Sequence, residues 1–426
     1  MPLVKLLILI LLASLYRDVL SQGYTSRYNT SAMPITKDAK TSLHTLFNYS
    51  LIDLDAPFTW QDCVIHNGPV ACGLEEGCRF PVQCDTTFCK EAHSYNNPKC
   101  PSLNITSKYG CKICAVTPLN PISKSCKLSQ LTTILMTFWG TDGHSPSSSA
   151  HYPIYGFGSE FVVSCAPSSL LKSLPEGAHG VEAFSWSTLA LPRQVQNIIP
   201  NVADKFALCL SSSSKAPGVT FLGEGPFYFT SFPNLDLRSI LSYTPMIRKH
   251  NTSLGYYIRI NRISINGISI PLQSLKSGSV KLSTVVPYTK LRSDIYKALV
   301  YSFAMATKSI PRMKSVQPFS FCLKSSAVGS VEKGFRVPKI GLETESGKIW
   351  TISGDNSMKR VGNGTVCLAF IDGGLKMKDV IVIGMYQMEN NFLFFDLGNQ
   401  KLGFSSSLLA RGTSCSSFNF TYVPEY

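Results

Sequence analysis

The hydrophobic residues of this chain fall mostly in short β-branched and aromatic runs, separated by Gly, Pro, Ser and Asn, which is the pattern of short strands. Helical spacing is rare. One helix is expected over residues 293–305, where Ser293 is the expected N-cap and Ile295, Leu299 and Phe303 share a face. A second short helix is expected near 192–199. The pattern predicts a mainly β protein with small helices. The expected strands cover residues 161–165, 205–210, 256–260, 348–352 and 380–383.

The N-terminus has a different pattern. A basic start and the apolar run LLILILL at residues 6–12 predict a secretory signal peptide over residues 1–21. This run is shorter than the roughly 20 apolar residues of a membrane span, and no later segment reaches that length. We therefore expect a secreted, extracellular protein without a membrane partner.

Cysteines and glycosylation sequons agree with export. The 14 cysteines are even in number, and ten lie between Cys63 and Cys165, so disulfides are expected rather than metal ligands. That preference includes Cys111 and Cys114, although their spacing also occurs in zinc and redox sites. No metal or other cofactor is expected. The six sequons are Asn29, Asn48, Asn104, Asn251, Asn363 and Asn419.

A short internal repeat indicates two halves of the chain. The segment DLDAPFT at residues 53–59 and the segment STVVPYT at residues 283–289 each follow an alternating strand and end in Pro-aromatic-Thr. Their separation is about half the chain, as two duplicated lobes would give, and it places Asp53 opposite Ser283. We expect an N-terminal lobe over 22–208, with a disulfide-rich insertion over 63–126, and a C-terminal lobe over 209–426.

Further motifs follow one another along the chain. They are PITKD at 34–38, SCAPS at 164–168, KFALCL at 205–210, WTISG at 350–354, VCLAFIDGG at 366–374, IGMYQME at 383–389 and LGFSSS at 402–407. Together with residues 51–60 and 282–289, this ordered set resembles a plant extracellular branch of the pepsin-like aspartic proteases. That branch comprises TAXI-type xylanase inhibitors, extracellular dermal glycoprotein and basic seven-S globulin.

The resemblance implies a bilobal pepsin-like aspartic protease fold with a central cleft. It also implies the disulfides Cys209–Cys415 and Cys322–Cys367. Two stretches depart from the family pattern. Residues 183–185 (AFS) replace a Gly-rich loop, and residues 128–139 hold no recognisable flap tyrosine.

The catalytic pair of this family is degenerate here. Aspartic proteolysis uses two carboxylates that share one proton, and Ser283 stands where the second acid is expected. Asp55 and Val285 replace the glycines of the two loops. We therefore expect no peptidase activity. Asp53 and Asp55 cannot replace the protease pair, because at alternate positions of a strand their Cα atoms are about 6.6 Å apart. That spacing would suit two glycosidase carboxylates, but neighbouring loop acids are common and a glycosidase is not expected.

Other catalytic motifs are absent, and the dispersed basic residues behind the net charge of +14 do not indicate nucleic-acid binding. The resemblance implies an inhibitor of secreted glycoside hydrolases of pathogens, acting in the apoplast or cell wall in plant defence. Xylanase-inhibiting relatives use a histidine in the C-terminal loop, whereas residues 407–415 offer Arg411. Relatives that inhibit xyloglucan-degrading enzymes use arginines, and a second loop before a Val-Pro pair offers Lys333 and Arg336. An endoglucanase or xyloglucanase target is therefore favoured over a xylanase. The alternatives are a residual or latent aspartic endopeptidase and a basic storage or peptide-binding protein.

Overall fold

The computed structural model describes residues 29–47, 49–62, 79–95, 97, 100–101, 113–134, 136, 138–152, 161–199, 201–249, 253–271, 279–331, 334–362 and 364–421. Several predictions lie outside these residues. They concern the signal peptide, Lys333, the sequons Asn48, Asn104, Asn251 and Asn363, and the cysteines Cys63, Cys72, Cys78 and Cys111.

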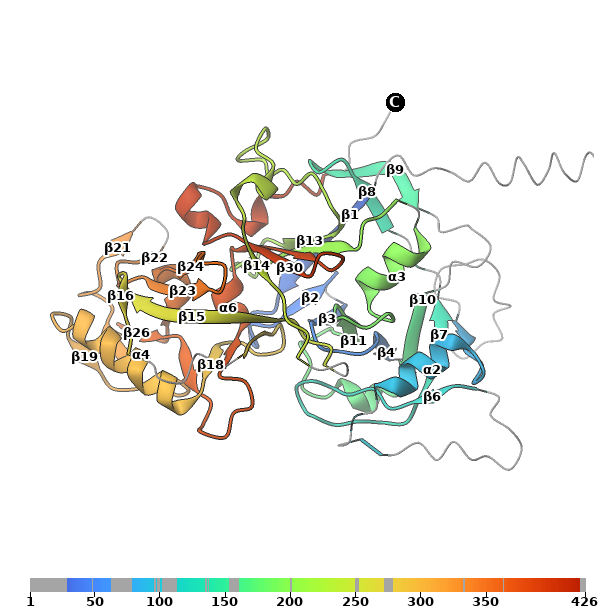
Figure 1. Cartoon of the computed structure of the whole chain (residues 1–426), viewed down its shortest axis with the longest axis horizontal. Helices are drawn as coiled ribbons and strands as arrows, with labels where there is room; N and C mark the ends of the chain where they lie inside the picture. The colour runs from blue at the N-terminus through green and yellow to red at the C-terminus, as the bar shows by residue number, and fades with distance from the viewer. Residues whose placement is uncertain are drawn as a thin grey trace, which may run out of the picture.

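Strands dominate the molecule, as predicted, and they gather into two lobes (Figure 1). The largest sheet has 16 strands and runs through the N-terminal lobe into the centre. Its strands are β1 (Thr30–Lys37), β2 (His44–Leu46), β3 (Ser50–Asp53), β4 (Trp60–Asp62), β5 (Arg79–Pro81), β6 (Ala115–Val116), β7 (Ser129–Ile134), β8 (Phe138–Thr141), β9 (Pro146–Tyr152), β10 (Phe161–Ala166), β11 (Gly180–Ala183), β12 (Lys205–Cys209), β13 (Gly218–Gly223), β14 (Ser242–Pro245), β29 (Phe392–Asp396) and β30 (Lys401–Phe404).

The C-terminal lobe contains three smaller sheets. Eight strands form the first: β15 (Tyr257–Ile265), β16 (Ile268–Ser269), β17 (Ser279–Leu282), β18 (Thr289–Leu291), β23 (Ile340–Thr344), β24 (Ile349–Ile352), β27 (Phe370–Asp372) and β28 (Ile381–Ile383). The others contain β19 (Arg312–Met313), β20 (Cys322–Lys324), β25 (Met358–Arg360) and β26 (Thr365–Leu368), and the pair β21 (Ser330–Val331) and β22 (Gly334–Phe335).

Helices are short and cover sheet edges and faces. They are α2 (Thr87–Ser94), α3 (Leu191–Ile198), α4 (Ser293–Ala306), α5 (Gly354–Ser357) and α6 (Met385–Met388), with 3₁₀ turns η1 (Ser168–Leu171), η2 (Leu237–Ile240), η3 (Leu408–Arg411) and η4 (Cys415–Ser417). No helix in the described part of the chain is long and apolar enough to cross a membrane. The sequence missed α2, and it misplaced the cap of α4: the N-cap is Arg292, while the Ser293 hydroxyl donates to Asp372 Oδ1.

The two lobes repeat one strand arrangement. In the N-terminal lobe the order is β3-β11-β4-β10, and in the C-terminal lobe it is β17-β28-β18-β27. In each set the first two strands are parallel, the middle two antiparallel and the last two parallel. The first strand of one set ends at Asp53, and that of the other set ends one residue before Ser283. The two segments of the internal repeat, residues 53–59 and 283–289, therefore begin equivalent loops in two similar units.

The central part of the large sheet joins the two halves of the chain. β29 pairs with β12, and the rings of Phe395 and Phe206 stack across this pair with centroids 4.4 Å apart. The expected boundary between residues 208 and 209 falls inside β12, and it stays a prediction. The disulfides in the described residues include Cys209–Cys415 and Cys322–Cys367, the two pairings that the resemblance implies. The insertion contains Cys89–Cys114 and Cys100–Cys126.

Candidate functional site

The loops that follow β3 and β17 touch each other. The Leu54 backbone N–H donates to Thr284 Oγ1 at 3.2 Å, which joins the two lobes at this point. Each loop is also closed by its own first residue: Asp53 Oδ1 accepts from the Asp55 N–H at 2.9 Å, and Ser283 Oγ accepts from the Val285 N–H at 3.4 Å. Asp53 and Ser283 thus occupy equivalent places in two contacting loops, and both are buried.

The charges around Asp53 differ from those in an active aspartic protease, where two carboxyl groups share one proton. Burial raises the pKa of Asp53 to about 6, and the neighbouring Asp55 carboxylate adds to the increase. Asp55 forms an ion pair with Lys281, whose side chain is mostly buried on β17. Lys124 also faces this region. Its pKa is lowered by burial, and Asp53 and Asp55 attract its charge. Lys281 and Lys124 thus place positive charge beside the carboxyl groups of Asp53 and Asp55.

The replaced loop at residues 183–185 packs directly behind Asp53. The Phe184 N–H donates to the Asp53 carbonyl at 2.9 Å, and the Ser185 hydroxyl donates to the Ala56 carbonyl at 2.6 Å. These two hydrogen bonds fix the loop that follows β3, although residues 183–185 contain no glycine. Sequence reasoning missed Lys124 and Lys281. Lys281 lies on the strand before Ser283, but its partner Asp55 is in the other lobe, so local pattern gave no signal for the pair.

The two predicted basic loops meet on the short helix α5. Arg336 follows β22, and Arg411 ends η3; both side chains are exposed. Gly354 opens α5 directly against β22, where a Cβ atom would lie 1.9 Å from the Phe335 carbonyl oxygen. On the other side, the Ser407 hydroxyl donates to the Asp355 carboxylate. One four-residue helix therefore contacts both loops that carry the arginines.

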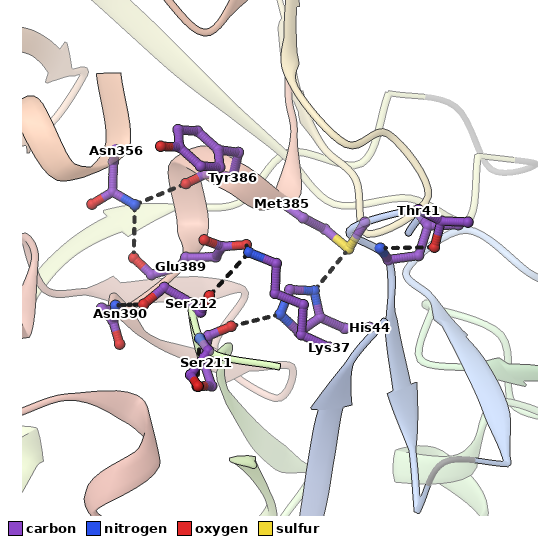
Figure 2. Close-up of polar contacts among 12 residues, drawn as sticks. Lys37, Thr41, His44, Ser211, Ser212, Asn356, Met385, Tyr386, Glu389 and Asn390 are labelled. Atoms are coloured by element: carbon purple, nitrogen blue, oxygen red, sulfur yellow. Dashed lines mark hydrogen bonds and ion pairs between the residues drawn. The ribbon is translucent and has the colours of Figure 1, made fainter. Parts of the chain in front are cut away.

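A buried polar cluster supports this arrangement (Figure 2). The Asn356 amide of α5 donates to the carbonyls of Tyr386 and Glu389 at 2.8 and 2.9 Å. The next residue, Asn390, accepts from the Leu408 N–H at 2.7 Å through its carbonyl. Lys37 of β1 reaches the same segment, with its Nζ 2.6 Å from Glu389 Oε1. Residues 385–390 thus tie both arginine loops to the N-terminal lobe.

His44 completes the cluster from the same lobe. It is fully buried, and burial lowers its pKa to about 4, so the ring is neutral at physiological pH. Its Nε2 lies 2.9 Å from the Ser211 carbonyl and therefore donates, while Nδ1 faces Met385 Sδ at 3.3 Å. His44 has a structural position and faces no open site.

One group of side chains could be mistaken for a metal centre. Among the described residues, Cys89, His93 and Cys114 are the only three or more potential ligand groups that lie close together. The two sulfurs form a disulfide with each other, so neither is a thiolate. Cys114 is consequently a structural cysteine, as the sequence led us to expect.

Comparison with known proteins identifies the family. The model described as xylanase inhibitor N-terminal matches residues 45–224, and the model described as xylanase inhibitor C-terminal matches residues 255–406. Chitinase CLP of Oryza sativa subsp. japonica is 36% identical over an alignment of 404 residues, and the match covers 91% of this chain and 90% of that protein.

Solved structures agree. The crystal structure of edgp has 30% sequence identity and a TM-score of 0.79, and the match covers 93% of this chain and 99% of that one. Basic 7S globulin from soybean has 26% identity and a TM-score of 0.72, with 92% and 98% covered.

The fold and the paired loops define a pepsin-like aspartic-protease fold with two lobes. Within that class, the chain belongs to the plant family of xylanase-inhibitor-like proteins, which includes basic 7S globulin and edgp. This confirms the resemblance indicated by the ordered sequence motifs.

Proposed function

We propose that this protein is a secreted inhibitor of cell-wall-degrading glycoside hydrolases. The observation that carries the proposal is that one short helix, α5, contacts both loops that carry the exposed Arg336 and Arg411. Neither guanidinium forms an ion pair with a carboxylate in the described part of the chain, so both are available to a partner. Lys333, which lies outside the described residues and three positions before Arg336 in the sequence, is proposed as a third contact.

The chemistry of the target matches this surface. Glycoside hydrolases carry two carboxylates that flank the scissile bond inside a cleft. An arginine that enters such a cleft forms charge-assisted, bidentate hydrogen bonds, and the positive charge of the chain increases the association rate. Two arginines on a fixed support lose less side-chain freedom on binding than two on independent loops.

The protein is proposed to act without catalysis. Ser283 cannot share a proton with Asp53, and Lys281 neutralises Asp55 from the other lobe. Membership in a family that contains storage globulins and inhibitors supports the absence of peptidase activity. The arginines, in place of a histidine in the C-terminal loop, favour endoglucanases or xyloglucanases over xylanases. The proposed place of action is the apoplast or cell wall, against enzymes from pathogens.

The test is an inhibition panel. Secreted endoglucanases, xyloglucanases and xylanases from fungi and oomycetes are assayed with the mature protein and with Arg336→Ala, Arg411→Ala and the double variant. Each truncation of a desolvated arginine should weaken inhibition by about 2 kcal/mol or more. Arg259→Ala is the matched control, because Arg259 is also exposed and its loss changes the net charge equally. Absence of inhibition across the panel, or equal losses in the control, would contradict the proposal.

A second candidate is chitin hydrolysis, because the rice relative is named a chitinase. The observation in its favour is that burial holds Asp53 partly protonated near pH 6, while Lys281 lies against the Asp55 carboxylate. Glycoside hydrolysis uses a protonated carboxyl group as general acid together with a second carboxyl group nearby. Release of sugars from chitin oligosaccharides, lost in Asp53→Asn, would support this function. No turnover by the mature protein between pH 4 and 7 would exclude it.

A further inference from the structure

A second concave site lies away from the paired loops and from the arginine surface. It is a cavity of about 600 Å³ on the face of the central sheet, built by β12, β29, β30 and β14 and by the segments that follow β13 and β23. Its volume lies in the range of small-molecule sites. None of the residues discussed above as functional lines it. Its lining includes Lys205, Glu224, Arg238, Tyr243, Asp396 and Asn399.

The charges of this cavity are balanced. Lys205 Nζ lies 2.8 Å from Glu224 Oε2 and 3.8 Å from Asp396 Oδ2. Arg238 pairs with Asp236 at 2.6 Å, which lies beside the cavity. Lys401 is the remaining cation of the lining, and it is exposed to solvent. An anionic ligand, such as a phosphate or carboxylate, would have to displace the acidic side chains from Lys205 and Arg238. A cationic ligand would have to displace these two basic side chains from the acids. The lining therefore favours a ligand without charge.

An aromatic ring lies on the floor of the cavity. Tyr243 is opposite Gly403 in the pairing of β14 with β30, and a Cβ atom at Gly403 would lie only 2.9 Å from Tyr243 Cε1. The absence of a side chain at Gly403 lets the ring lie across the neighbouring strand. Tyr243 as a residue remains 38% exposed and lines the cavity, so it is open to a ligand.

Hydrogen-bonding groups surround this ring. The Asn399 amide donates to Asp396 Oδ2 at 2.9 Å, which fixes its plane and leaves its oxygen free within the described part of the chain. The second oxygen of Glu224 and the Tyr243 hydroxyl likewise form no side-chain hydrogen bond within the described part of the chain. Planar donors and acceptors beside an exposed aromatic face match the chemistry of a sugar, whose C–H face packs on a ring while its hydroxyl groups bond at the edge.

We propose that this cavity binds a neutral oligosaccharide of the plant or microbial cell wall. Tyr243 is the platform, and Asn399, Glu224 and Asp396 bond the hydroxyl groups. Such a site would hold the protein on the polysaccharide that its target enzymes attack. The site does not depend on the arginine loops, so it goes beyond the proposed inhibition and can be correct or wrong independently of it.

The experiment measures binding of defined oligosaccharides to the full mature protein by calorimetry and by saturation-transfer NMR. The probes are hexasaccharides of β-1,4-linked glucose, xylose, mannose and N-acetylglucosamine, and a xyloglucan heptasaccharide. At least one should bind, and Tyr243→Ala should weaken it by about tenfold. Tyr243→Phe keeps the ring and should retain most of the affinity. Tyr301→Ala is the control, because Tyr301 is a 69% exposed tyrosine on α4.

Three results would overturn the proposal. The first is that no probe binds at concentrations up to about 10 mM. The second is equal affinity in the wild type and in Tyr243→Ala. Polygalacturonate is added as an anionic control probe. The third result is binding to this probe alone that disappears in high salt, which would show general attraction to a basic protein rather than a built site. Inhibition of a glycoside hydrolase by Tyr243→Ala should be unchanged, which keeps this test separate from that of the arginine surface.

Discussion

The buried ion pair between Lys37 and Glu389 joins the N-terminal lobe to the support of the arginine loops, and its removal should be costly. The two side chains are only 8% and 3% exposed. Lys37→Met removes the cation and the hydrogen bond to the Ser212 carbonyl, and it leaves the Glu389 carboxylate buried. Breaking such a pair from one side costs about 3–5 kcal/mol of folding free energy. That is a large part of the total stability of a typical domain, about 5–15 kcal/mol.

The loss should depend on pH with a defined sign. Burial raises the pKa of Glu389, and Lys37 opposes that increase, with a weaker contribution from Lys359. Without Lys37 the pKa of Glu389 rises further above its value in the unfolded chain. The folded variant therefore takes up a proton as the pH falls, and the stability difference from the wild type should shrink between pH 8 and pH 5.

Urea unfolding followed by tryptophan fluorescence at these two pH values tests this account. The double variant Lys37→Met/Glu389→Gln, which has no buried charge, should be more stable at pH 8 than Lys37→Met alone. Lys40→Met is the control, since Lys40 pairs with Glu176 on the surface and its removal should cause no measurable change. A Lys37→Met variant that unfolds like the wild type at pH 8, or a double variant no more stable than the single one, would refute the reasoning.

Three further predictions follow from other parts of the structure. Burial raises the pKa of Glu182 to about 7, so the stability that its protonated form contributes is lost as the pH rises through that value. The neutral variant Glu182→Gln should therefore stabilise the protein by about 3 kcal/mol at pH 8.5 and not at pH 4. Thermal unfolding at the two pH values measures this difference. Ser283→Asp alone should yield no pepstatin-sensitive peptidase activity at pH 3–5, because Lys281 and Asp55 remain; turnover in this variant would show that one residue separates the scaffold from catalysis. Mild reduction followed by limited proteolysis should give first cuts between Cys63 and Cys126, where most of the cysteines lie, and cuts confined to residues after 209 would contradict this.

The repeated features of the fold could be predicted from the sequence. The two segments that begin at Asp53 and Ser283 are local patterns, and their equal places after a strand follow from alternation alone. The helix α2 could not be found in the same way. Its buried residues are only Cys89 and Ala92, and its large apolar residue Phe88 is exposed, so hydrophobic spacing gave little signal there. The structure shows that a Thr86 cap and the Cys89–Cys114 bond hold this helix instead.

The site was predictable only where single residues carry the chemistry. Arg336 and Arg411 were found as exposed basic residues in two loops, but their common support was not. That support depends on the close contact of Gly354 with the Phe335 carbonyl and on the hydrogen bond from the Ser407 hydroxyl to the Asp355 carboxylate. The ion pair of Lys37 with Glu389 joins residues from opposite ends of the chain, and no local pattern encodes such a contact.

The pairing of β29 with β12 has a consequence during synthesis of the protein. When the N-terminal half has left the ribosome, β12 has β13 on one side, but its other partner, which begins at Phe392, has not yet been made. Until then the unpaired backbone groups of Phe206, Ala207 and Leu208 form an open strand edge, which is a template for association with another chain. A chain that stops before residue 392 keeps this edge permanently. Premature termination before residue 392 should therefore produce an aggregating product rather than a shortened but folded protein.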